Sequence, residues 1–410
     1  MPASPSTARA INDRLALRLL QREGPLTAGQ LKQLTGLSRP TVADLVERLT
    51  ASGLIEMVGE SGARRRGPNA RLYGIVGDRA HLAALDVRLE SVSVLVSDLV
   101  GRVLAEASVP IDADAGTGPA VEQAVALVER AVKEAGAGSG PTGPEETGVQ
   151  RREWGSLHTV GIGAPGLIDP ATGELRDTTG LPAWHRSLVG ALQERLPDAR
   201  VVVENETNLA ALAEMRDGAA RDRDTFVLLW LDMGIGAAVV LDGALRRGAS
   251  GGAGELGFLP VPGTRGLPSA TDCEGGFHSL AGAAAVLELA RECGVLGTGG
   301  AGDQATAAEV VRWAAATVTD VRAARFLDTL ADRLALGVAS VVALLDPGCV
   351  VLGGEVGQAG GDELAVRVAG RIAAMSPLPV EVRPSVLGDA AVLRGALLTA
   401  QDGAQDELFG

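Results

Sequence analysis

Hydrophobic positions in residues 26–49 repeat with the 3.6-residue period of a helix in two short runs, and a glycine separates the runs. Thr27 can cap the first helix, Gly36 supplies the turn, and Ser38 can cap the second helix. The pattern predicts a helix-turn-helix. Its buried seam is expected to contain seven apolar residues, Leu31, Leu34, Leu37, Val42, Leu45, Val46 and Leu49.

The flanking segments predict a winged form of this motif. An apolar-periodic helix in residues 11–20 precedes it, and residues 53–75 are typical of two strands joined by a basic turn. That turn carries Arg64, Arg65 and Arg66. A run of three arginines alone is more typical of a solvated loop, but beside a helix-turn-helix we expect it to contact phosphates or a minor groove.

Charge is divided along the chain in the same way. Residues 1–77 carry 11 Lys and Arg against 6 Asp and Glu, although the whole chain has a net charge of −14. Because an acidic body repels nucleic acid, double-stranded operator DNA should meet only the winged helix-turn-helix domain, residues 1–78. Arg39 is the strongest candidate for a bidentate contact to guanine. The expected DNA-binding residues are Thr27, Ser38, Arg39, Thr41, Arg48, Arg64, Arg65 and Arg66.

Beyond residue 78 strands and helices alternate, and one pattern of strand, turn, strand, turn and strand occurs at both 81–110 and 225–248. Two such meanders can arise by coincidence, but their repetition favours two related α/β lobes that face each other across a cleft. We expect the first lobe at 79–200, with a flexible Gly- and Pro-rich insertion at 135–155. The second lobe should occupy 201–410, with a final helix that can pack back on the first lobe.

Composition and cysteine usage are those of an ordinary globular protein. The chain is 46% hydrophobic and 21% charged, and no uninterrupted apolar run is long enough to span a bilayer. Its first residues lack the apolar core of a secretory signal, so we expect a cytoplasmic location. Cys273, Cys293 and Cys349 offer no paired-thiol framework, and we expect them to be reduced.

Several motifs follow one another in a specific order, namely GPLTAGQLKQLTGLSRPTVADLVERL, VGIGAPGLID, LPAW, VENETNLAALAE, LDMGIGAAVVLDGALRRGASGGAGELG, LDPGCVVLGGEV and LGDAAVLRGALL. With them the chain resembles transcriptional regulators of the ROK (repressor, open reading frame, kinase) family over nearly its whole length. The resemblance implies a winged helix joined to a two-lobed, actin-like sugar-kinase body of the ribonuclease H-like class. It also implies a homodimer or homotetramer.

The same resemblance implies that Asn205, Glu206 and Glu255 bind a small-molecule effector, such as a sugar. Glu206 stands where the kinases of the family have an aspartate base, and its longer side chain would misplace the carboxylate for catalysis. Phe258 stands where the family has a histidine. These departures are expected to change or abolish sugar specificity, and the longer side chain of Glu206 favours binding over catalysis. Caps of the following helix are the competing interpretation for Asn205 and Glu206.

Phosphate and metal binding also depart from the family pattern. The kinases hold phosphate on a glycine-rich hairpin, because backbone N–H groups approach phosphate closely only where side chains are absent. This chain has no glycine in residues 86–90, and Glu90 adds a negative charge there. Cys273 and His278 are too few ligands for the structural zinc of the family. We therefore expect no catalytic residue, no metal and no cofactor.

Three hypotheses of function remain. The leading one is a DNA-binding transcriptional regulator, a repressor rather than an activator, whose body binds a sugar or related metabolite between its lobes and thereby alters the spacing of paired winged helices. The second is a ROK-type sugar kinase with a vestigial DNA-binding domain. The third is a DNA-binding regulator that responds to no ligand.

Overall fold

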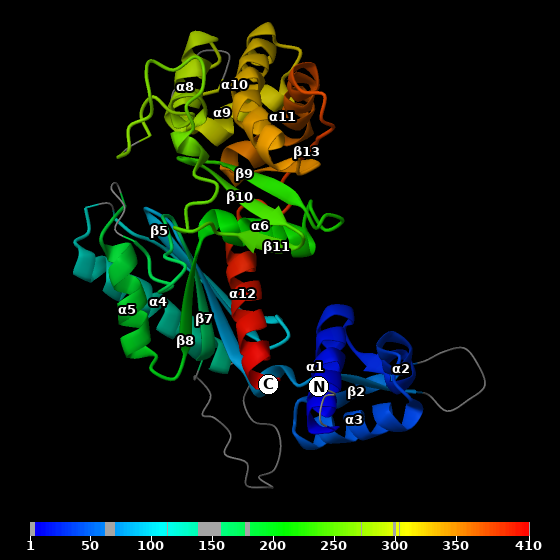
Figure 1. Cartoon of the computed structure of the whole chain (residues 1–410). Coiled ribbons are helices and arrows are strands. Elements are labelled where there is room, and N and C mark those ends of the chain that lie inside the picture. The colour runs from blue at the N-terminus through cyan, green and yellow to red at the C-terminus, as the bar shows by residue number, and fades with distance from the viewer. Residues whose placement is uncertain are drawn as a thin grey trace.

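The computed structural model of this chain describes residues 5–61, 70–112, 114–137, 157–176, 181–271, 273–297, 301–302 and 304–409. An amino-terminal domain of helices and a small sheet lies beside one end of a larger body, which contains two separate sheets (Figure 1). Within those ranges, no helix is both long and apolar enough to cross a membrane.

The amino-terminal domain is a winged helix-turn-helix. Its elements are α1 (Pro5–Glu23), β1 (Leu26–Thr27), α2 (Ala28–Thr35), α3 (Arg39–Ala51), β2 (Ile55–Ser61) and β3 (Ala70–Ile75). Strand β3 pairs antiparallel with both β1 and β2, so the wing expected in residues 53–75 belongs to a three-stranded sheet. The three arginines at 64–66 lie outside the described residues.

Local capping explains where these helices begin and end. The Thr27 side chain accepts a hydrogen bond from the Gln30 N–H in a capping box, and the Ser38 side chain accepts one from the Thr41 N–H at the start of α3. Gly36 ends α2 with a φ of 71°, a left-handed conformation that favours glycine. The expected seam is buried or partly buried except for Leu34, which is 47% exposed. Leu34 lies in the last turn of the short helix α2, at the edge of its apolar face, and Leu31 lies at the centre of that face.

The first lobe contains a five-stranded sheet in the order β6-β5-β4-β7-β8. Its elements are η1 (Gly77–Arg79), β4 (His81–Val87), β5 (Ser91–Asp98), β6 (Val103–Pro110), α4 (Thr117–Ala137), β7 (Leu157–Ala164), α5 (Trp184–Arg195) and β8 (Arg200–Asn205). The strand β8, which completes this sheet, extends beyond residue 200, where the sequence places the boundary between lobes. Residues 135–137 of the expected flexible insertion are the last turn of α4, and residues 138–156 lie outside the described ranges.

The second lobe repeats this strand order as β11-β10-β9-β12-β13. Its strands are β9 (Phe226–Leu231), β10 (Ile235–Leu241), β11 (Ala244–Arg246), β12 (Cys349–Gly353) and β13 (Glu381–Pro384). Its shorter helical elements are η2 (Leu256–Phe258), α7 (His278–Ala281), α8 (Ala283–Glu292) and α9 (Ala307–Ala316), and its long ones are α10 (Val321–Leu345) and α11 (Gly354–Met375). In both lobes the first meander strand pairs in parallel with the next strand, so the repeat predicted from the two meanders is present.

Two helices, α6 (Glu206–Asp217) and α12 (Ala390–Leu408), lie between the sheets (Figure 1). Helix α12 packs on β4 and β7 of the first lobe, while α6 packs on α12 and on β9 and β10 of the second. Glycines make this packing close. A Cβ on Gly161 would meet the Ala396 carbonyl oxygen at 2.4 Å, and a Cβ on Gly395 would meet the Leu209 carbonyl oxygen at 2.0 Å.

Candidate functional site

The candidate DNA-reading surface is the exposed start of α3. Arg39 is exposed, and no described residue forms an ion pair with it. The Ser38 and Thr41 hydroxyl groups lie 2.7 Å apart at the same end of the helix. A free guanidinium beside two hydroxyl groups provides donors and acceptors of the kind that read base edges and phosphates.

Two other residues predicted to bind DNA form contacts within the winged helix domain. Thr27 is only 8% exposed, and its hydroxyl group forms hydrogen bonds within the cap of α2. The Arg48 guanidinium donates to Asp13 of α1 at 2.6 Å and also to Asp44. The contact between Arg48 and Asp13 joins α3 to α1. Without rearrangement, neither the Thr27 hydroxyl group nor the Arg48 guanidinium is available to DNA.

In the body, Asn205 joins β8 to α6. Its side-chain oxygen accepts from the N–H groups of Thr207 and Asn208 at 2.9 and 3.3 Å. Its amide nitrogen donates to the Gly166 carbonyl oxygen at 3.1 Å and to Glu206 Oε2 at 2.7 Å. Asn205 therefore caps the helix and also positions the carboxylate of Glu206, which faces the residues of both lobes.

Several carboxylates surround Glu206. The pKa of Glu206 is raised to about 8, mainly by burial and in smaller part by the nearby charges of Asp86, Glu255 and Asp232. Burial also raises the pKa of Glu255. Asp86 lies near the end of β4 in the first lobe, and Asp232 follows β9 in the second. The charges of both act on Glu206, so this residue lies near the equivalent ends of the two sheets.

A second pair at this junction, Glu204 and Arg247, has no counterpart among the residues predicted from the sequence. Arg247 Nε donates to Glu204 Oε2 at 2.6 Å, and the Glu204 side chain is 7% exposed. The other Glu204 oxygen accepts from the Asn205 N–H and from the Asn208 side chain, both at 2.9 Å. This buried glutamate holds the start of α6 to the loop that leads to Glu255. The 43 residues between the partners explain why no local pattern indicates the contact.

The hairpin between β4 and β5 carries a cross-lobe ion pair in place of a phosphate cradle. Arg88 Nε donates to Asp86 Oδ2 at 3.0 Å, and Arg88 Nη1 donates to Glu355 Oε1 at 3.0 Å. The Arg88 N–H donates to the Ser91 carbonyl oxygen, so it is not available to phosphate. Carboxylates at 86, 90 and 355 do not fit a nucleotide phosphate.

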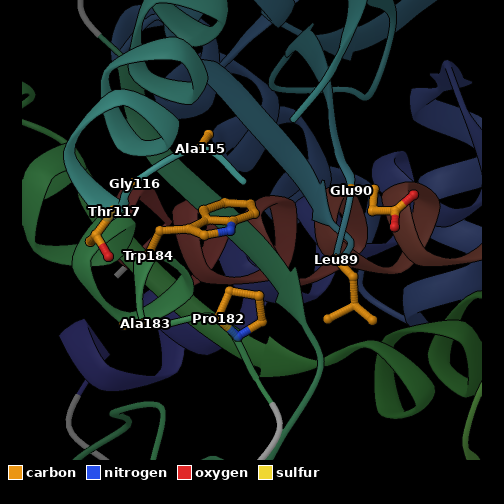
Figure 2. A pocket seen from close by; sticks show the side chains of 8 residues that line it. All are labelled: Leu89, Glu90, Ala115, Gly116, Thr117, Pro182, Ala183 and Trp184. Carbon is orange, nitrogen blue, oxygen red and sulfur yellow. The ribbon is translucent and has the colours of Figure 1, made fainter. Parts of the chain in front are cut away.

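Two cavities flank this hairpin. One of about 440 Å³ lies between the hairpin and the first residues of α4 and α5, and the indole of Trp184 is at its centre (Figure 2). A smaller one of about 210 Å³ lies on the second lobe, where Glu309, Glu355 and Asp389 outnumber the single guanidinium of Arg312. Neither cavity is lined by Asn205, Glu206 or Glu255.

The cysteine segment does not fit a structural zinc ion. No group of three His, Cys, Asp or Glu residues that could hold a metal exists in the part of the chain that the structure describes. Cys293 and Cys349 are buried and Cys273 is partly exposed, and none of the three forms a disulfide with another described residue. Phe258 is partly buried in η2, where the family resemblance places a histidine.

Comparisons with known proteins agree with this two-part architecture. The ROK family model matches residues 148–403, and a MarR family model matches residues 11–66. The chain therefore belongs to the ROK family and carries a MarR-type winged helix, the combination found in the transcriptional regulators of that family.

Individual relatives include both regulators and kinases. The xylose repressor of Caldicellulosiruptor bescii is 24% identical over 353 residues, covering 85% of this chain and 84% of the repressor. A glucokinase of Halalkalibacterium halodurans is 32% identical over 266 residues, covering 59% of this chain and 76% of the kinase. The crystal structure of a ROK family transcriptional regulator, a homologue of the E. coli MLC protein, has the same fold with a TM-score of 0.75, 19% identity and 98% coverage of both chains.

Proposed function

We propose that this protein is a transcriptional repressor that binds operator DNA through α3 and the wing, and that a sugar or related polyol in the cleft controls it. The similarity to the xylose repressor covers 85% of the chain and therefore extends into the DNA-binding domain, whereas the similarity to the glucokinase covers 59% of the chain. As a homo-oligomer the protein would present paired winged helices to a two-fold operator.

The observation that carries this proposal is the contrast between the two halves of the cleft. Asn205, Glu206 and Glu255 retain groups that bind hydroxyl groups, whereas Arg88 and Glu355 close the position where a nucleotide phosphate would lie. A site of this kind can recognise a polyol without transferring phosphate to it. We therefore infer that the protein is not an enzyme.

Operator release tests the proposal. Fluorescence anisotropy should detect binding to fragments from the promoter region of the protein's own gene, with steep salt dependence. A thermal-shift panel of neutral sugars, sugar phosphates and nucleotides should then identify an effector that releases the DNA. Binding without release by any compound would favour the ligand-independent regulator. Hexose-dependent ATP consumption in a coupled assay would instead support the kinase.

A further inference from the structure

The linker between β3 of the winged helix and β4 of the body, residues 76–80, contacts one turn of the first lobe. This turn joins β5 to β6, and its buried residue Leu99 donates its N–H to the Gly77 carbonyl oxygen at 2.9 Å. Gly77 also lies close to the Asp98 side chain, because a Cβ on Gly77 would meet Asp98 Oδ2 at 2.8 Å. Gly77, the second residue after β3, is thus fitted to the turn.

Internal hydrogen bonds hold the turn in one conformation. Asp98 Oδ1 accepts from the N–H groups of Val100 and Arg102 at 3.1 and 2.8 Å. Gly101 adopts a φ of 83°, and its N–H donates to the Asp98 carbonyl oxygen. Because these contacts are made within five residues, the turn can act as a rigid contact surface rather than a flexible loop.

The carbonyl group of Leu99 is bound by side chains from the last turns of α12. The Leu99 carbonyl oxygen accepts from Gln401 Nε2 at 3.0 Å and from Gln405 Nε2 at 3.1 Å. Both glutamines are at least nine-tenths buried. Leu99 therefore connects the linker, through its N–H, to α12, through its carbonyl group.

Apolar packing and surface pairs extend this contact to α1. Ala16 and Leu20 of α1 belong to the same buried cluster as Ala404 of α12, and Phe409 packs against that cluster. At its rim Asp406 pairs with Arg18 at 3.4 Å. Figure 1 shows the lower end of α12 beside α1, with the two chain termini close together.

We propose that the Leu99 turn docks the winged helix on the first lobe as one rigid unit, so that any movement between the lobes carries the DNA-binding surface with the first lobe. The opposite end of α12 is packed on β4, β7 and α6, and α6 begins at Asn205 and Glu206. The inference rests on the proposed function only for its effect on DNA binding, since the docking itself can be measured without DNA.

The Gln401→Met and Gln405→Met double substitution tests the docking. Methionine keeps similar length and volume but removes both donors to the Leu99 carbonyl group. By hydrogen–deuterium exchange on the full chain, amides of residues 77–80 and 99 should exchange about tenfold faster, which corresponds to about 1.4 kcal/mol. Amides of α3 should be unchanged. Gln193→Met is the matched control, because Gln193 Nε2 donates to the Ala199 carbonyl oxygen far from the linker.

A second perturbation acts from the linker side. Gly77→Ala forces a methyl group against the Asp98 carboxylate and should accelerate the same amides even if the double variant fails to fold. Unchanged exchange in Gly77→Ala, or equal exchange in the double variant and Gln193→Met, would overturn the inference.

Operator affinity then tests the consequence of docking. Undocked domains must be ordered when they bind paired half-sites, so the double variant should bind operator about tenfold more weakly than the parent. Faster exchange with unchanged affinity would refute the rigid-unit model. If the unsubstituted protein does not bind operator DNA, that result counts against the proposed function alone. The hydrogen–deuterium exchange of residues 77–80 and 99 then decides whether the docking is correct.

Discussion

Replacing Arg88 should destabilise the protein more than replacing its partner Glu355, although Arg88 pairs with both Asp86 and Glu355 at 3.0 Å. The two carboxylates differ in exposure. The Asp86 side chain is 5% exposed, whereas that of Glu355 is 42% exposed. Burial raises the pKa of Asp86, and the Arg88 guanidinium opposes that rise. Arg88 therefore compensates the buried charge of Asp86 and forms a solvent-exposed ion pair with Glu355.

The magnitudes follow from this asymmetry. An exposed ion pair contributes about 0–1 kcal/mol, so Glu355→Gln should cost about 0.5 kcal/mol. Removing the partner of a fully buried charge costs about 3–5 kcal/mol. Arg88 itself is 35% exposed, and water can partly replace it, so we expect Arg88→Met to cost about 2 kcal/mol.

Chemical denaturation at neutral pH measures both values. Adding Asp86→Asn to Arg88→Met should recover part of the loss, because the uncompensated buried charge is then gone. High salt should reduce the effect of Glu355→Gln more than that of Arg88→Met, since screening acts mainly on exposed charges. Equal costs for the two single substitutions, or no recovery in the Asp86→Asn and Arg88→Met pair, would refute the reasoning.

Three further predictions concern DNA, pH and metal. Arg39→Ala should weaken operator binding by about 1–3 kcal/mol and relax one base position, whereas Arg65→Ala should weaken binding to all sequences and lower the salt dependence; unchanged preference in the Arg39→Ala protein would show that α3 is placed wrongly. The raised pKa of Glu206, about 8, means that the folded state holds its proton more tightly than the unfolded chain, so stability should fall as pH rises from about 4.5 to 8. Glu206→Gln should flatten this fall in pH-dependent denaturation, and an unaltered profile would contradict the assignment. Elemental analysis after purification without added metal should find no zinc, and one zinc per chain would disprove our account of the cysteine segment.

Local patterns were sufficient for the DNA-binding domain because its signals lie within a few residues of each other. The caps at Thr27 and Ser38 follow from side chains that bind nearby backbone, and the turn at Gly36 follows from the left-handed conformation that glycine adopts readily. A contact with a distant partner could not be predicted in this way. Arg48 looks like a solvent-facing basic residue in α3, but Asp13, 35 residues away, binds it.

In the body, the sequence repeat predicts the two sheets, because each meander sets the order of its first three strands. The contacts between the two lobes have no such local signal. Arg88 and Glu355 are 267 residues apart, and only the approach of the two lobes makes them partners. The roles of Asn205, Glu206 and Glu255 in binding an effector stay predictions, because the hydrogen bonds of Asn205 also satisfy the cap of α6.

The position of α12 has a consequence for biosynthesis. Helix α12 covers β4 and β7, so the inner face of the first sheet stays open to water until residues 390–408 have left the ribosome. The winged helix can fold early, but its support on the body is incomplete until α12 docks. A nascent or prematurely terminated chain would therefore expose a large apolar face and become a substrate for chaperones and proteases.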